Sequence, residues 1–161
     1  MTTVQAQPIT ATCLASELVK RRDRIGIPTT NLDLQKLAYF CQGWHLALLG
    51  RPLICGEEFE AWRFGPVLPS VYHKFKVFAS NPVPANSPLV QWEVQLDPNT
   101  DSSLLIDRVL EVYNRSSSFD LVQMSHAPNG PWAAAWAEGN FSNPIDNGHI
   151  RDYFLQQSQN N

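Results

Sequence analysis

The densest apolar pattern in the chain lies between Thr30 and Ser70, in the segment TNLDLQKLAYFCQGWHLALLGRPLICGEEFEAWRFGPVLPS. Apolar and small side chains recur there at helical spacing and form one stripe, which comprises Leu34, Leu37, Ala38, Cys41, Trp44 and Leu48. Others cover much of the remaining circumference: Leu32, Tyr39, Gly43, Leu46 and Leu49. A helix that is apolar on most sides is buried among other elements. The pattern therefore predicts a central helix at about 31–49.

Local signals mark both ends of this helix. Thr30 is suited to cap its start, with Asp33 as a capping-box partner. Gly50, which tolerates a left-handed conformation, ends it. Gly43, which lacks a side chain, would let a neighbouring element approach closely.

Shorter helices are predicted on both sides of the central helix. They run from about Ala11 to Arg24, from Pro69, from Ser102 to about Asn114 with Asp101 as cap, from Ser117 or Ser118, from Pro131, and from Asp146 or Asn147. The polar ends, 1–9 and 156–161, are expected to fray, which leaves a core of about 11–155. The length of 161 residues suits one domain.

Two segments with a period of two residues predict a small β element. At about 53–64, charged and aromatic residues alternate with apolar ones, and Gly65-Pro66 ends the predicted strand. A second short strand is predicted at about 91–96, with Trp92, Val94 and Leu96 on one face. The expected fold is mainly α with a minor α+β character: a compact single-domain helical bundle around the central helix.

Composition and charge narrow the function classes. The hydrophobic fraction of 43% and the charged fraction of 17% are typical of a folded chain. The net charge of −3 does not favour nucleic acid as a partner. The basic run Lys20–Arg24 keeps a nucleic-acid-binding regulator open as an alternative, although cations are also favourable at a helix C-terminus. No apolar run is long enough to span a membrane and no signal peptide is recognisable, so the expected location is the cytoplasm.

Candidate chemistry is sparse. The three cysteines form no CxxC pair, and the four histidines show no metal-binding spacing. The chain contains no glycine-rich phosphate loop and no GxSxG motif. Glu57, Glu58 and Glu60 leave a metal site open, but clustered carboxylates in a hairpin are usually exposed. We predict no catalytic, cofactor-binding or metal-binding residues, and an enzyme is the least favoured alternative.

Three patches carry a resemblance to a known family. LQKLAYFCQGWHLALLGRPL with FEAWRFGPVLPSVYHKFK, then LVQMSHAPNGPW, then IRDYF, resemble the Panacea domain in order and spacing. This is the SocA-like, phage-associated domain common in bacterial antitoxins. His45 and Ser125 depart from the pattern, where an aromatic residue and a threonine are common.

The resemblance implies a function as well as a mainly helical fold. It implies neutralisation of a co-encoded toxin by direct protein–protein contact. In the SocA branch it implies an adaptor that delivers the toxin to a cytoplasmic AAA+ protease. Many members add a second domain, and we expect none here. A standalone antitoxin, a proteolytic adaptor and another phage-associated interaction role therefore stay open.

The corner Trp62-Arg63-Phe64-Gly65-Pro66 is the predicted partner site. It combines aromatic and arginine side chains, which are enriched in protein interfaces, with a constrained backbone. The alternative is that Trp62 and Phe64 cover the central helix and that His126 satisfies helix carbonyls. The full hypothesis comprises Trp62, Arg63, Phe64, Gly65, Pro66, Tyr72, Lys74, His126 and Trp132.

Overall fold

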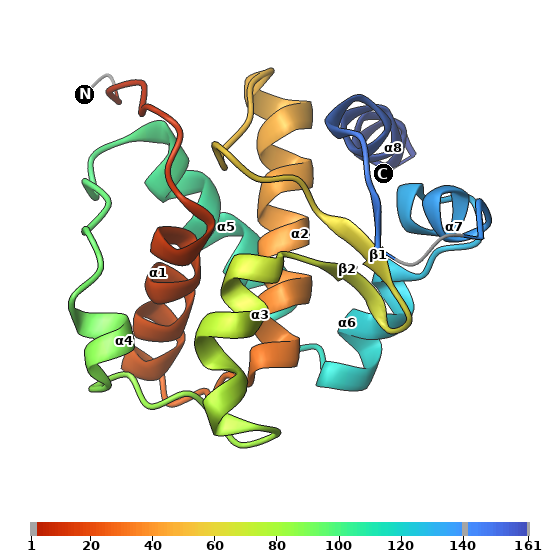
Figure 1. Cartoon of the computed structure of the whole chain (residues 1–161). Coiled ribbons are helices and arrows are strands. Elements are labelled where there is room, and N and C mark those ends of the chain that lie inside the picture. Colours follow the sequence, from red (N-terminus) through yellow and green to blue (C-terminus); the bar gives the residue numbers. More distant parts are fainter. Residues whose placement is uncertain (1–2, 140–141, 161) are drawn as a thin grey trace.

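Helix α2 (Asn31–Leu49) is the centre of the fold, and the remaining helices are arranged around it (Figure 1). The computed structural model describes residues 3–139 and 142–160. Helix α2 packs against five helices and strand β2. The helices around it are α1 (Ala11–Arg24), α3 (Pro69–Phe75), α4 (Pro88–Gln91), α5 (Asp101–Tyr113), α6 (Ser118–Ser125), α7 (Pro131–Trp136) and α8 (Asn147–Gln159). A 3-10 turn, η1 (Lys76–Phe78), follows α3. The mainly α prediction is confirmed.

The burial of α2 agrees with its sequence pattern. Fourteen of its 19 residues are buried, including the polar residues Gln35, Lys36 and Gln42. The predicted capping box between Thr30 and Asp33 is present, and Gly50 ends the helix with a φ of 74°. One assignment is wrong: Leu48, placed on the buried stripe, is 61% exposed. At the last turn of the helix, Ala47 and Leu49 pack against the core, whereas Leu48 lines an open hollow beside α5.

Gly43 is the point of closest approach between α2 and α8. A Cβ atom built on Gly43 would lie 2.2 Å from the Phe154 ring. Phe154 is buried and packs edge-on against Tyr39 and Trp44, at centroid distances of 5.6 and 5.1 Å. The absent side chain therefore creates the space that the α8 aromatic ring fills.

The β element is a three-stranded antiparallel sheet of order β2-β1-β3. Strand β1 (Glu60–Trp62) pairs with β2 (Gly65–Val67) and, on its other side, with β3 (Asn143–Pro144). The predicted strand at about 53–64 is therefore shorter, and Gly65-Pro66 begins the return strand instead of ending the element. Pro66 lacks an N–H donor, and it is accommodated because β2 is an edge strand.

The strand predicted at about 91–96 is wrong. Ser87 caps the short helix α4, and the chain then continues without pairing to the sheet. Trp92 and Val94 are 86% and 75% exposed, so the alternation reflects no buried face.

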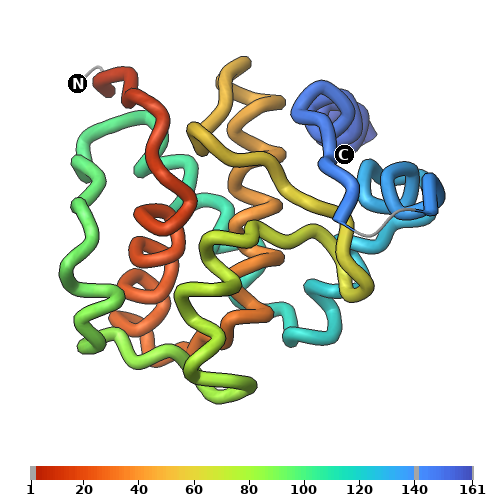
Figure 2. Tube along the Cα trace, in the orientation of Figure 1, coloured from red at the N-terminus to blue at the C-terminus, as the bar shows by residue number. Residues whose placement is uncertain are grey.

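The ends of the chain are more ordered than their polarity suggests. Val4 and Ile9 form isolated bridges with Thr100 and Ile54. Helix α8 continues to Gln159, into the tail that was predicted to fray. In the tube view, the N-terminal segment lies beside α1 and α5, and the C-terminal helix lies on the opposite side of α2 (Figure 2). No described helix has the length and apolarity that crossing a membrane requires.

Hydrogen bonds of His45 connect the C-terminal part of α2 to the segment that follows it and to α5. His45 Nδ1 donates to the Arg51 carbonyl at 2.7 Å, so Nε2 accepts from the Ser102 hydroxyl at 2.8 Å. Burial lowers the pKa of His45, which favours this neutral form. The predicted cap of α5 is corrected: Thr100 caps it, while Asp101 forms an ion pair with Arg51 at 2.7 Å.

We predict that Gly43→Ala destabilises the protein. The added methyl group meets the Phe154 ring, and overpacking of this kind costs about 1–3 kcal/mol, enough to outweigh the gain in helix propensity of about 1 kcal/mol. Urea unfolding measures the change. The Phe154→Leu background serves as control, because a smaller side chain should relieve part of the cost. An equal cost in both backgrounds would contradict the assigned contact.

Candidate functional site

The β1–β2 hairpin presents an aromatic and a cationic side chain at its tip. Trp62 and Gly65 are the last paired residues, so Arg63 and Phe64 form the two-residue turn. Phe64 is 62% exposed, and the Arg63 guanidinium lies over its ring at 5.4 Å. Gly65 has a φ of 114°, a conformation that favours glycine, and this residue lets the chain reverse tightly.

A groove of about 490 Å³ lies between this hairpin, the start of α2 and helix α3. The Trp62 and Tyr72 rings meet edge-on in its wall, with centroids 5.0 Å apart. Leu32 and Val67 add apolar surface. The charged residues of its lining are Arg63 and Lys36, and no carboxylate is among the described lining residues. The groove is therefore mainly apolar, with the exposed Arg63 guanidinium at its rim.

Lys36 is buried beneath the groove. Its side chain is fully inaccessible to solvent, and Nζ donates to the Pro66 carbonyl at 2.9 Å. Burial lowers the pKa of Lys36 to about 7. A Cβ atom on Gly65 would lie 2.8 Å from this Nζ, so the glycine also makes room for the lysine.

Gln35 supports the same strand edge. Its Oε1 accepts a hydrogen bond from the Leu68 amide at 2.8 Å, and its Nε2 donates to Asn31 at 3.0 Å. Side chains of α2 thus satisfy polar backbone groups at the edge of β2 that would otherwise be unpaired. The hairpin is fixed to the central helix.

The opposite side of the hairpin contacts α6 and α7. Trp132 Nε1 donates to the Trp62 carbonyl at 2.7 Å, and the His126 ring stacks on Trp132 with centroids 4.1 Å apart. Burial and the nearby Lys36 charge lower the pKa of His126, while a backbone contact with Phe64 opposes this shift. His126 Nε2 is buried and has no hydrogen-bond partner among the residues that the structure describes.

The predicted partner residues divide into two groups. Trp62, Arg63, Phe64 and Tyr72 line the groove. The others lie behind it or have other partners: Gly65 and Pro66 are buried, His126 and Trp132 support the hairpin, and Lys74 forms an ion pair with Glu93 at 2.7 Å.

Sequence reasoning missed Lys36, Gln35 and Leu32 as parts of this site. Lys36 did carry a signal, because it is a charge on a helix that is apolar on most sides. Its acceptor, however, lies 30 residues further along the chain, where no local pattern indicates it.

The other charged clusters contact the protein itself. Lys20 and Arg21 pair with Glu17 at 3.2 and 2.9 Å, and Arg22 is buried. Glu57 accepts hydrogen bonds from the first turn of α3 at Ser70. Over residues 3–139 and 142–160, no group of three or more metal-ligating side chains comes together.

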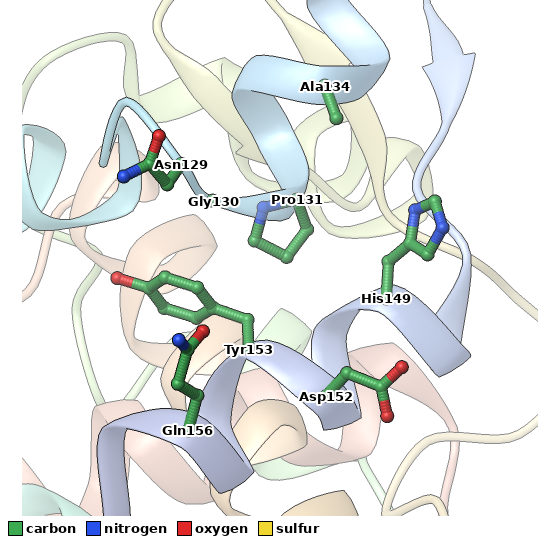
Figure 3. Close-up of a pocket in the computed structure, with 8 residues that line it drawn as sticks. All are labelled: Asn129, Gly130, Pro131, Ala134, His149, Asp152, Tyr153 and Gln156. Atoms are coloured by element: carbon green, nitrogen blue, oxygen red, sulfur yellow. The ribbon is translucent and has the colours of Figure 1, made fainter. Parts of the chain in front are cut away.

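Two further hollows contain none of the predicted partner residues. Figure 3 shows the smaller one, of about 220 Å³, where Tyr153 and Gln156 of α8 lie opposite Asn129 and Pro131 at the start of α7. The larger, of about 630 Å³, lies between α5 and the end of α2. The groove beside the hairpin remains the candidate site because the predicted residues converge there.

Comparisons with known proteins identify the family of this chain. The family described as "Antitoxin SocA-like, Panacea domain" matches residues 34–133, and Antitoxin SocA of Caulobacter vibrioides (strain NA1000 / CB15N) is 38% identical over 136 residues. That alignment covers 81% of this chain and 72% of the relative. The chain belongs to the SocA-like Panacea family. The family match includes Lys36, the whole hairpin and Trp132. No solved structure matches the chain.

For this Panacea domain, we predict a pH dependence of stability that is due to Lys36. Its pKa is about 7 in the folded chain and about 10.4 when unfolded, so the unfolded chain binds more protons between these values. The free energy of unfolding contributed by this site therefore rises with pH, by up to about 1.4 kcal/mol per unit.

Urea unfolding of the wild type and of Lys36→Met at pH 7.0, 7.75 and 8.5 tests this prediction. Thiols and tyrosines are common to both proteins, so their titration cancels in the difference. The stability of the wild type relative to Lys36→Met should rise across the series. A constant difference would show that Lys36 is not held with a lowered pKa.

Proposed function

We propose that this protein is a non-enzymatic antitoxin that neutralises a co-encoded toxin by binding it at the hairpin groove. Its membership of an antitoxin family and its similarity to Antitoxin SocA support the antitoxin role. We place this role in the bacterial cytoplasm, where a toxin encoded beside it would be made. The observation that favours this site is the exposed Phe64–Arg63 tip beside a groove lined by Trp62 and Tyr72.

The groove has the composition of a protein-binding surface. Aromatic and arginine side chains dominate the energetics of protein interfaces when they sit in or beside a pocket. Phe64 is available to insert into a partner, and the groove is large enough to receive a partner side chain in return. Both features lie within one continuous surface.

The frame of the groove favours tight binding. Lys36, Gln35 and Trp132 hold the hairpin by hydrogen bonds from two sides, at 2.9, 2.8 and 2.7 Å. A site that is rigid before binding loses less conformational entropy when the complex forms. The hairpin is therefore prepared for a partner without refolding.

A proteolytic adaptor would use the same complex. In that case the bound toxin is passed to a AAA+ protease, and neutralisation requires the protease. Rescue of growth in a strain that lacks the protease separates the two forms: rescue persists if binding alone blocks the toxin and is lost if delivery is required.

Protein is a better candidate partner for this chain than nucleic acid. In the basic run, Lys20 and Arg21 are paired and Arg22 is buried, which leaves Arg24 as its exposed cation. Nucleic-acid binding needs cations that are free to contact phosphates.

We predict that Arg63→Asp weakens binding to the product of the adjacent reading frame by at least about tenfold and abolishes rescue of growth. Phe64→Ala should act similarly, because it removes the exposed anchor. Isothermal titration measures the affinity, and circular dichroism verifies that each variant is folded.

Arg24→Asp is the matched control. Arg24 is also exposed but lies on α1, away from the groove, and the same charge change there should leave the affinity within about twofold. If folded Arg63→Asp and Phe64→Ala both bind as tightly as the wild type, the toxin is bound elsewhere.

A further inference from the structure

Basic side chains outnumber acidic ones among the described residues that line the groove. Arg63 at its rim is a cation, burial lowers the pKa of Lys36 beneath it to about 7, and the described lining residues include no aspartate or glutamate. The neighbouring carboxylates have partners of their own: Glu60 accepts from Trp62 Nε1 at 3.1 Å, and Glu93 pairs with Lys74.

The two basic side chains differ in their access to a partner. Lys36 Nζ is enclosed and bonded to the Pro66 carbonyl, so its position is fixed. Arg63 is exposed, and no ion pair within residues 3–139 and 142–160 engages it. The free guanidinium at the rim of the groove favours a carboxylate there.

The side chains that line the groove favour binding of an apolar side chain from a partner. Leu32, Tyr72 and Phe64 are 40%, 38% and 62% exposed, and all three line the groove. Apolar surface of this extent, bordered by a charge, is typical of interaction sites. The volume of about 490 Å³ lies within the range of ligand-binding pockets.

We propose that the groove receives a toxin segment in which a large apolar side chain is followed or preceded by an acidic residue. The apolar side chain lies against Leu32 and Tyr72, and the carboxylate pairs with Arg63. This inference rests on the proposed function, and it adds the chemistry of the partner segment that the groove recognises.

A charge-swap experiment tests the pairing. Arg63→Glu should weaken binding of the adjacent gene product by at least about tenfold. Each aspartate and glutamate of that gene product is then replaced by lysine in turn. One such replacement should recover at least about tenfold in affinity toward Arg63→Glu while weakening binding to the wild type.

Arg24→Glu is the control, and it should bind the unmodified gene product as the wild type does. If Arg63→Glu loses binding and no acidic position compensates, the carboxylate pairing is wrong although the site stands. If Arg63→Glu binds normally, the pairing is wrong, and normal binding by Phe64→Ala as well would show that the site is wrong too.

A small-molecule probe tests the groove without any toxin. Indole-3-acetate carries a carboxylate on an apolar ring, and indole-3-acetamide is its neutral counterpart. NMR titration should show the acid binding at least about fivefold more tightly than the amide, with Arg63→Gln reducing the ratio to about one. Leu32→Trp, which fills the groove, should abolish binding of both.

The charge-swap experiment and the small-molecule titration together separate the inference from the proposed function on which it rests. If the wild type does not bind the adjacent gene product at all, the proposed function fails, and the ratio of acid to amide affinity still decides the chemistry of the groove. Equal binding of acid and amide by the wild type would overturn the inference.

Discussion

The hydrogen bond between Lys36 and the Pro66 carbonyl joins the central helix α2 to the β1–β2 hairpin, and the candidate groove depends on this connection. Helix α2 is buried on nearly every side, so it provides a rigid reference for all elements that pack against it. A lysine inside such a helix is costly unless it has a partner, since burial penalises the charged form. The edge carbonyl of β2 provides that partner, and the lysine in turn fixes the hairpin.

This constraint explains why the groove lies where it does. Gln35 and Trp132 reinforce the attachment, so the tip residues Arg63 and Phe64 extend from a supported base. The core faces of α2 and the groove share one helix, and a change at Lys36 acts on both. The groove is in this sense a direct extension of the core, and its apolar walls and exposed Arg63 are residues that the core leaves uncovered.

The sequence predicted the core better than the site. An apolar pattern on most sides of 31–49 is unambiguous, and its caps are local signals. The return strand was missed because Gly65-Pro66 usually ends a strand, and only its edge position allows the proline. The strand at 91–96 was wrong because alternation alone does not show that one face is covered. Trp62, Arg63, Phe64 and Tyr72, which line the candidate groove, were proposed from residue type, whereas Lys36 depends on a contact between distant segments.

Hydrogen exchange of the backbone amides, measured with and without the product of the adjacent reading frame, tests the central claim most directly. If the hairpin groove is the binding surface, the amides of residues 61–72 and of the first turns of α2 should exchange more slowly in the complex. Unchanged exchange there, with new protection at the larger hollow between α5 and the end of α2, would contradict the assignment of the site.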